Sequence, residues 1–562
     1  MTVMLPFEQK IRNVKRVADI VAVLVKHGFG DVVQELGFEK LIERSNRVFG
    51  LRRIVPEFEH LPRKVRLRKA MEDLGPTFIK LGQVLSTRPD LIPEDWADEF
   101  KLLQDDAPRL TEEEVQKRLK EEFGDQIDDL FQVIDHAPLA AASMAQAHRA
   151  KMKTGEDVVI KILRPGIAEI TRADMEAMRV IAEYAQTRFS NLGYSPVEVV
   201  SQFAKELEKE VDLTLEGRST DRLRRIFEGD PGVLFPKVFW AATTKNVLTV
   251  EEMKGQLLSR LDPATLGVEE RRTLVENGAR AVLRQCLEVG FFHADPHPGN
   301  LFAMPGGAIG FIDCGMTGQL DDRTTQDLAE LVAGVARGDL DMVLAVMASL
   351  ADIDQEKLDD RPFRADVREF VARFQSTPME ELNFGLLLRE FFEKLQDHHI
   401  RCPGDLVLLI KALTTIEAVA SSLDPSFELA TFARPFVEKL VMRKYSVTAA
   451  RKRMQMGIVQ YAELMEDLPR EVRGIISQVR KNRFAINLEH RGLSRLTHTI
   501  EHASRNISFS LIVASMFVGS SILILASRGD VTWVLRSFGI AGFVASFLLL
   551  IIMVVTTRRF KE

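Results

Sequence analysis

Residues 291–315, FFHADPHPGNLFAMPGGAIGFIDCG, hold several side chains that could do chemistry within a short distance of one another. His293, Asp295 and Asn300 form the pattern H-x-D-x-x-x-x-N, and Asp313 follows in D-x-G after the apolar run AIGFI. Phosphoryl transfer needs a carboxylate near the attacking oxygen and metal-binding groups around the nucleotide phosphates. Asp295 fits the first role, whereas Asn300 and Asp313 fit the second. The stretch is therefore interpreted as a nucleotide and metal site.

Two other interpretations of this stretch stay open at the level of the motif. His293, Asp295 and His297 could bind a metal ion, although the prolines and the glycine among them prevent a helix that places both imidazoles on one face. A polar loop without a catalytic role is the second alternative, because the spacing of one short motif can arise by chance. The three interpretations are distinguished by whether the other residues of a nucleotide site lie upstream in the right order.

Upstream, Lys161 lies in the otherwise apolar run DVVIKIL, where a lysine that reaches the α- and β-phosphates is expected. The run EVDLTLEG offers Glu210 and Glu216 as alternative ion-pair partners for this lysine. The run VEEMKG, with Glu251 and Met253, is interpreted as a link between two lobes where adenine could bind the backbone. Lysine, helix glutamate, link, catalytic loop and D-x-G follow one another as in a protein kinase.

Several features depart from an ordinary protein kinase. The G-x-G-x-x-G loop is absent, and residues 138–148, PLAAASMAQAH, take its place before the lysine. The catalytic loop has H-A-D and lacks the arginine that commonly answers activation-loop phosphorylation. Only MTGQL separates D-C-G from Asp321 and Asp322, which are expected to start a helix. A platform for peptide substrates is therefore not expected.

The elements that position these residues are expected to form an α+β fold of two lobes. Helical periodicity fills the first part of the chain, and Thr111 with Glu114 predicts a helix start. The runs MAQAHRAKM and DVVIKIL predict two strands joined by KTGE. A long helix is expected from Ser195 and Pro196, with Glu198 in a capping box, to Gly217 as its stop. Another strand is expected at NVLTVEEM, and helices follow the D-x-G motif.

The run LGPTFIKLGQVLSTRPDL, residues 74–91, is a further unusual feature. At helical spacing Lys80 and Gln83 share one face. A solvated polar face is the plain interpretation of that pair. A second face is apolar and consists of Leu74, Phe78, Leu81 and Leu85.

Composition excludes some classes of function. The chain has 562 residues, which is too long for a single ordinary core, and a net charge of −6 without a basic block, so nucleic acid is not an expected partner. Its three cysteines, Cys286, Cys314 and Cys402, support neither a disulfide framework nor a four-ligand zinc site. A reducing compartment is expected.

Two uncharged apolar runs, Ile507 to Ala526 and Phe538 to Val555, each have about the length that a bilayer requires. They predict a transmembrane hairpin, with a buried hairpin in a soluble core as the alternative. The basic flanks, with Arg505 before the first run and Arg558, Arg559 and Lys561 after the second, place both ends and the preceding domain on the cytoplasmic side. A bacterial inner membrane is the expected location. The N-terminal segment is expected to form an amphipathic helix rather than a signal peptide.

The motifs together resemble the UbiB family, also called AarF or ADCK proteins, over nearly the whole chain. The family's K-x-G-Q motif matches Lys80, Gly82 and Gln83, its alanine-rich loop matches Ala140, Ala141, Ala142 and Ser143, and its E-x-D motif matches Glu210 and Asp212. The lysine and helix glutamate of its active site match Lys161 and Glu216, and the catalytic and metal positions match Asp295, Asn300 and Asp313.

The resemblance implies an atypical kinase-like ATPase that binds ATP or ADP with Mg²⁺ and supports the synthesis of an isoprenoid quinone of the ubiquinone type. It implies that the K-x-G-Q helix covers the active site and blocks peptide substrates. The nucleotide would contact the alanine-rich loop, Lys161, Glu251 and Met253, with Asp295, Lys161 and Glu216 as catalytic residues.

The domains expected are an N-terminal helical extension at 1–130, a kinase-like N-lobe at 131–255, a C-lobe with a helical extension at 256–500 and a transmembrane hairpin at 507–555. Membrane lipids, intermediates or enzymes of quinone synthesis and, as an option, a second copy in a homodimer are the expected partners. Two rival functions stay open. One is a small-molecule or lipid phosphotransferase, and the other is a non-catalytic scaffold that binds nucleotide and lipid.

Overall fold

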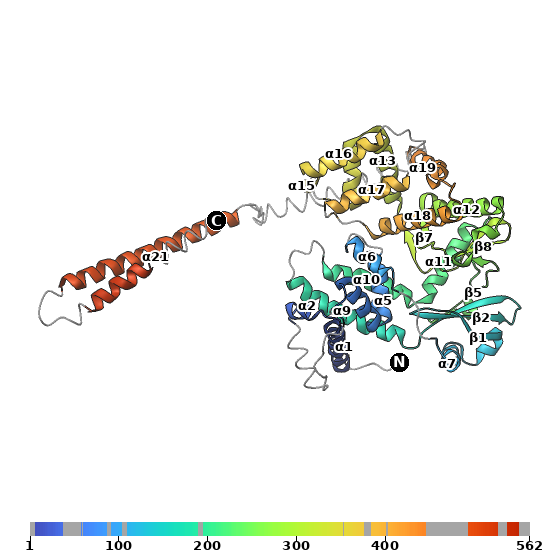
Figure 1. The fold of residues 1–562 in the computed structure, drawn as a ribbon, viewed down its shortest axis with the longest axis horizontal. Helices are drawn as coiled ribbons and strands as arrows, with labels where there is room; N and C mark the ends of the chain where they lie inside the picture. Colours follow the sequence, from blue (N-terminus) through green and yellow to red (C-terminus); the bar gives the residue numbers. More distant parts are fainter. Residues whose placement is uncertain are drawn as a thin grey trace, which may run out of the picture. The chain divides into compact units, whose positions relative to one another are not determined.

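The chain divides into two compact units, Met1–Arg453 and Met454–Glu562, and each is described by itself. Figure 1 traces both units in sequence colours. The computed structural model describes residues 6–37, 58, 60–86, 92–103, 109–188, 195–351, 353, 355–375, 384–398, 400, 403–445, 493–526 and 537–549.

A four-stranded antiparallel sheet is the centre of the first lobe, with the strand order β1-β2-β3-β5. The two strands expected from MAQAHRAKM and DVVIKIL are β2 and β3. Gly155 lies in the turn between them with a φ of +102°, a conformation that favours glycine. The strands span Phe131–Ala141 (β1), Ala145–Met152 (β2), Asp157–Leu163 (β3) and Val247–Glu251 (β5).

Helix α7 (Glu112–Phe123) covers one face of this sheet, and Lys161 lies on the other face. Its neighbours Ile160 and Ile162 are fully buried in an apolar core that they share with residues of α7. Because side chains alternate along a strand, Lys161 points to the other face. The capping box expected at the start of α7 is present: Thr111 and Glu114 cap each other's backbone.

Helices of the N-terminal extension pack on the other face of the sheet and form a second apolar core. The single helix expected from Leu74 through Leu85 is wrong, because α4 ends at Leu74 and α5 starts at Pro76. Gly75 separates the two helices with a φ of +100°. Leu74 and Phe78 are nevertheless buried in the same core. The helices of the extension are α1 (Pro6–Lys26), α2 (Gly30–Glu35), α4 (Arg63–Leu74), α5 (Pro76–Ser86) and α6 (Glu94–Phe100). Two helices that follow β3 in the chain, α9 (Ile167–Arg188) and α10 (Pro196–Glu210), pack in the same core.

The helix expected from Ser195 to Gly217 is two helices. Ser195 does cap the start of α10, where its hydroxyl accepts a hydrogen bond from the backbone N–H of Glu198. That helix ends at Glu210, and Asp212 caps a new helix, α11 (Leu213–Ile226). Gly217 is therefore not a stop but lies inside α11, where an added Cβ would lie 3.1 Å from Leu248 and 3.2 Å from Trp240. An aspartate that can cap a helix start explains the break.

The second lobe combines short strands with a large helical core. The expected strand AIGFI is β9, and the helix expected after Asp321 is α13, with Asp321 as its cap. The expected two-lobed α+β fold is thus confirmed. The sheets have the orders β4-β9-β8-β6 and β10-β7, from Val233–Leu234 (β4), Gln256–Leu257 (β6), Phe291–His293 (β7), Leu301–Met304 (β8), Ala308–Phe311 (β9) and Thr317–Gln319 (β10). The helices are α12 (Val268–Leu283), α13 (Asp322–Arg337), α14 (Leu340–Ala351), α15 (Gln355–Leu358), α16 (Arg361–Gln375), α17 (Phe384–Asp397), α18 (Gly404–Leu423) and α19 (Leu429–Tyr445).

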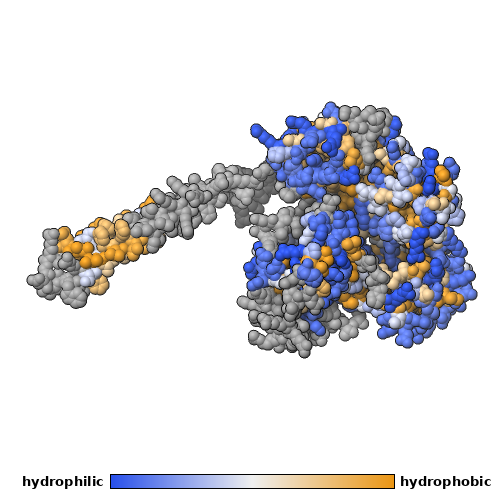
Figure 2. All heavy atoms as spheres, viewed as in Figure 1, coloured by the Kyte–Doolittle hydropathy of each residue, from blue (hydrophilic) through white to orange (hydrophobic). Residues whose placement is uncertain are grey.

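In the second unit, α21 (Leu493–Ala526) contains the first expected span, and a shorter apolar helix covers Ser537–Leu549. Among the described residues, Ile507–Ala526 and α18 are the two helices long and apolar enough to cross a membrane. Only 11% of the first is buried, and its apolar surface is visible in Figure 2, whereas α18 contributes to the core of the second lobe. Two apolar helices near the C-terminus are therefore present. Residues 550–555 of the second expected run lie outside the described residues.

Candidate active site

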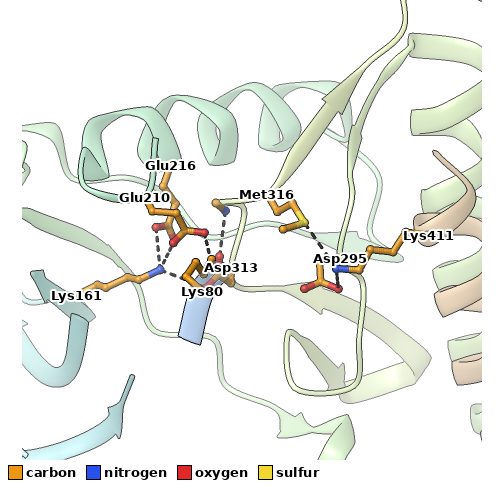
Figure 3. A network of polar contacts seen from close by, with 9 residues as sticks. Lys80, Lys161, Glu210, Glu216, Asp295, Asp313, Met316 and Lys411 are labelled. Atoms are coloured by element: carbon orange, nitrogen blue, oxygen red, sulfur yellow. Dashed lines mark hydrogen bonds and ion pairs between the residues drawn. The ribbon is translucent and has the colours of Figure 1, made fainter. Parts of the chain in front are cut away.

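The strand lysine and the helix glutamate of the expected site form an ion pair. Lys161 Nζ lies 3.0 and 2.8 Å from the two carboxylate oxygens of Glu216 (Figure 3). Strand β3 holds the lysine and α11 holds the glutamate, so the pair ties one helix to the sheet. Of the two glutamates that the sequence left open, Glu216 is the partner of this lysine.

Asp313 completes a cluster of three charges. Its Oδ2 lies 3.2 Å from Lys161 Nζ, and its Oδ1 accepts a hydrogen bond from the backbone N–H of Gly315. Burial raises the pKa of Glu216 to about 7, although Lys161 opposes this. Burial opposes the charge of Asp313 too, but Lys161 outweighs it and lowers the pKa of that carboxyl. The Asp313 side chain is 42% exposed, so solvent screens part of this interaction. Burial disfavours a charged Lys161, yet Asp313 and Glu216 raise its pKa.

The catalytic loop places Asp295 and Asn300 close together. Asn300 Nδ2 donates to the backbone oxygen of Asp295 at 3.2 Å, which leaves the amide oxygen as the atom that could bind a cation. His293 is fully buried and accepts a hydrogen bond from the Asp295 backbone N–H through Nδ1. Burial lowers the pKa of His293 to about 4, although Asp313 opposes this. His293 is therefore neutral near pH 7 and supports the backbone of the loop.

The alternative of a metal site built on two histidines finds no support in the geometry. His297 Nδ1 accepts from the backbone N–H of Gly299 at 2.9 Å, which closes a local turn. No group of three or more histidine, cysteine, aspartate or glutamate side chains that could hold a metal ion occurs within the described ranges. Cys286 and Cys314 are free and buried, and Cys402 lies outside the described residues.

The K-x-G-Q residues lie on α5, and one of them reaches the site. Lys80 Nζ is 2.6 Å from Glu210 Oε1, at the end of α10 (Figure 3). Gln83 Nε2 is 3.5 Å from the backbone oxygen of Leu103. A side chain on Gly82 would lie 2.1 Å from Leu103, so glycine is needed for close packing here.

Asp212, the second acid of the E-x-D motif, has a different environment. Its Oδ1 accepts hydrogen bonds from the backbone N–H and the hydroxyl of Thr214, and Lys245 lies 4.0 Å from its other oxygen. The two acids therefore belong to two different helix ends. Glu210 is the last residue of α10 and pairs with Lys80, whereas Asp212 caps the start of α11. The helix break explains how residues two apart have separate surroundings.

The alanine-rich segment is a strand end and a tight turn rather than a long loop. Ala140 and Ala141 are the last residues of β1, and Ala142 with Ser143 forms the turn into β2. The backbone N–H of Ala142 donates to Ala145 at 2.8 Å, and Arg164 Nε donates to the Ala142 carbonyl at 2.9 Å. Arg164, which the sequence did not single out, thus supports this turn from the end of β3.

The link between the lobes follows β5. The backbone N–H of Glu251 donates to the carbonyl of Lys237 at 2.9 Å, and the Glu251 side chain accepts from the Lys237 backbone. Met253 lies next to β9, since an added Cβ on Gly310 would lie 2.8 Å from its methyl group. Of the two residues expected to contact adenine, Met253 is therefore the one whose side chain borders the second lobe.

The sequence analysis missed one residue that contacts the catalytic loop. Lys411 Nζ, from α18, lies 2.9 Å from Asp295 Oδ1 and 3.7 Å from the sulfur of Met316 (Figure 3). The available signal was a lysine within the apolar run LVLLIKAL. The long separation in sequence hid its partner.

Three family models match this chain. Residues 102–347 match the model of the ABC1 atypical kinase-like domain, and residues 367–428 match the UbiB helical domain. Residues 491–559 match the ABC1/UbiB kinase-like C-terminal domain. A relative named probable protein kinase UbiB, from Pseudomonas aeruginosa, is 32% identical over 81% of this chain and 87% of its own.

The chain belongs to the UbiB family. A second relative named probable protein kinase UbiB, from Pseudomonas fluorescens, is 34% identical over 78% of this chain and 83% of its own. An uncharacterized Synechocystis protein is 32% identical over 81% and 79%. A solved Mycobacterium tuberculosis protein, in a complex with erythromycin, aligns with a TM-score of 0.46 at 21% identity, covering 73% of this chain and 98% of that one. The match of residues 102–347 to the ABC1 atypical kinase-like domain confirms the expected kinase-like fold.

Proposed function

We propose that this protein is a membrane-anchored, Mg²⁺-dependent ATPase of the atypical kinase type that supports the synthesis of an isoprenoid quinone. The observation that carries the proposal is the contact of Lys161 with both Glu216 and Asp313, at 2.8 and 3.2 Å. A lysine that is paired with a helix glutamate and lies beside the D-x-G aspartate is the arrangement that positions the nucleotide phosphates in protein kinases.

The donor set at the proposed metal position suits Mg²⁺. An ionised carboxylate on Asp313 and an amide oxygen on Asn300 are hard oxygen ligands, which Mg²⁺ prefers. Bound there, the ion would neutralise charge on the phosphate oxygens. Asp313 would hold it and Asn300 would complete its protein ligands, while Lys161 anchors the phosphates.

Asp295 takes the proton in the proposed reaction. As the oxygen of water or of a hydroxyl group bonds to the γ-phosphorus, its proton passes to the Asp295 carboxylate. The bond from phosphorus to the bridging oxygen breaks, and the electron pair leaves with ADP. The neutral, buried His293 fixes the backbone of this aspartate.

The proposal of a role in quinone synthesis rests on the relatives and on the C-terminal helices. Relatives named UbiB cover most of the chain, and the apolar helix Ile507–Ala526 is largely exposed. Membrane lipids and lipid-soluble quinone intermediates would meet the protein at such a surface. The Lys80–Glu210 pair supports a site covered by α5, which disfavours peptide substrates.

ATP turnover by the full-length protein in detergent, with MgATP and a phenolic lipid, tests the proposal. We expect phosphate release, and we expect Asp313→Asn to lower the rate by about 100-fold or more. Asp341→Asn is the matched control, because this aspartate forms an exposed ion pair with Arg364 and is 87% exposed. Equal rates for wild type and Asp313→Asn would overturn the assignment. A phosphorylated lipid in the mass spectrum would show transfer to an acceptor in place of hydrolysis.

A further inference from the structure

A lysine from the helical extension contacts the catalytic loop. Lys411 lies on α18, whose other inward residues, among them Leu409, Ala412 and Leu413, are buried in the core of the second lobe. The Lys411 side chain is 21% exposed, and Asp295 is 26% exposed. A lysine that is largely removed from water is costly unless an anion compensates its charge. Asp295, 2.9 Å away, is that anion.

The same ammonium group also contacts the segment that follows D-x-G. Its nitrogen lies 3.7 Å from the sulfur of Met316. The Met316 carbonyl accepts the backbone N–H of Ala294, and Thr317 pairs with His293 between β10 and β7. Lys411 therefore lies where the catalytic loop and the segment after Asp313 are held side by side.

The catalytic loop itself lacks a cation that could perform this task. Its sequence is HADPHPGN, with alanine where ordinary kinases have arginine, and it contains no lysine. His297 uses its ring to close the local turn with Gly299. The positive charge next to Asp295 thus comes from a helix far along the chain, within the residues that match the UbiB helical domain.

We propose that Lys411 is the positioning residue for Asp295. This inference rests on the proposed function and assigns to α18 a part in the same site. The ammonium group fixes the orientation of the carboxylate, so that the free oxygen faces the attacking water or hydroxyl group. Misplacing a reacting group by about 1 Å can lower the reaction rate roughly 100-fold, so a residue that only orients Asp295 can have a large effect on the rate.

The test is a double-mutant cycle in the full-length protein in detergent. Lys411→Met is expected to lower kcat for ATP hydrolysis roughly 10- to 100-fold, with KM for ATP within about twofold. Lys411→Arg, which keeps a positive charge, is expected to recover most of the rate. In the Asp295→Ala background, Lys411→Met is expected to cause no further loss, because it acts through Asp295.

Lys394→Met is the matched control. Lys394 lies on α17 and is 28% exposed, and its ion-pair partner within the described part of the chain is Asp397, at 3.4 Å. We expect it to leave kcat unchanged. Thermal unfolding of every variant separates a lost fold from a lost rate.

Two results would overturn the inference while the proposed function stands: wild-type kcat in Lys411→Met, or an equal loss from this change with and without Asp295. A wild-type protein that does not turn over ATP would overturn the proposed function and the inference with it.

Discussion

At the scale of single residues, the spacing of the motifs predicted Lys161, Asp295, Asn300 and Asp313 as site residues. The structure brings Lys161 to Asp313 and Asn300 to Asp295. Sequence order could not decide which glutamate pairs with Lys161, because that choice depends on where α10 ends. The structure gives Glu216 to Lys161 and Glu210 to Lys80. The contact of Lys411 could not be predicted, because its partner Asp295 lies far earlier in the chain and no local sequence pattern relates the two residues.

The raised pKa of Glu216 has a consequence for stability. Its folded-state pKa of about 7 exceeds its ordinary value of 4.5, so the folded protein binds the proton more tightly than the unfolded chain does. The contribution to stability is complete below pH 4.5 and is lost as the pH rises to about 7. We therefore expect the melting temperature of the wild type, relative to Glu216→Gln, to fall across this window.

Thermal unfolding of both proteins between pH 4.5 and 7.5 measures this difference. The pKa of Asp313 is lowered and that of Lys161 is raised, so neither group titrates within the window. His293 contributes a slope of the opposite sign to both proteins, which cancels in the comparison. Parallel curves would show that Glu216 is not held as a buried acid.

At the scale of elements, the strands around Lys161 and the cap of α7 followed the sequence, because each depends on neighbouring residues. The helix boundaries at Gly75 and Asp212 did not. Apolar periodicity continues across both positions, so it hides a glycine with positive φ and an aspartate that caps a second helix. These two breaks place Lys80 and Glu216, and the functional geometry depends on them.

Close packing of α5 explains one residue of the K-x-G-Q motif physically. A Cβ on Gly82 would lie 2.1 Å from Leu103 and 2.8 Å from Met71, and both side chains are buried. Gly82→Ala is expected to destabilise the protein by about 1–3 kcal/mol, since the core must shift to admit the methyl group. Chemical denaturation measures the change.

Gly30→Ala is the control for this substitution. Gly30 starts α2 in the same N-terminal extension, and nothing lies within 4 Å of a Cβ placed there. The alanine at this position is expected to be neutral or slightly stabilising. A Gly82→Ala protein as stable as Gly30→Ala would contradict the packing argument.

At the scale of the whole molecule, the order of strand and helix patterns predicted the two lobes, and hydropathy predicted the two apolar C-terminal helices. Helix α18, which the sequence analysis did not name as a span, is also long and apolar enough to cross a membrane. Burial makes the distinction: α18 lies in the core of the second lobe, whereas Ile507–Ala526 is largely exposed.

Charges placed in the exposed apolar helix are expected to release the protein from membranes. Ile512 and Val518 are 55% and 58% exposed, and arginine at the centre of a spanning helix costs about 2.5–3.5 kcal/mol. The double variant Ile512→Arg, Val518→Arg should shift the protein from the membrane fraction to the soluble fraction in a flotation assay.

The matched control carries Val268→Arg and Met442→Arg, at positions that are each 69% exposed in the larger unit. This control should remain with the membrane. Retention of the double variant in the membrane fraction would indicate that another surface anchors the protein.

Phosphoryl-transfer chemistry at Asp295 and Asp313 is proposed to support quinone synthesis. Its most direct test is the isoprenoid quinone content of cells that lack this protein, supplied either with the wild type or with the Asp295→Ala, Asp313→Ala double variant at equal abundance. We predict that the wild type restores the quinone pool and that the double variant leaves quinone precursors accumulated. Full restoration by the double variant would contradict the claim and would favour a non-catalytic scaffold.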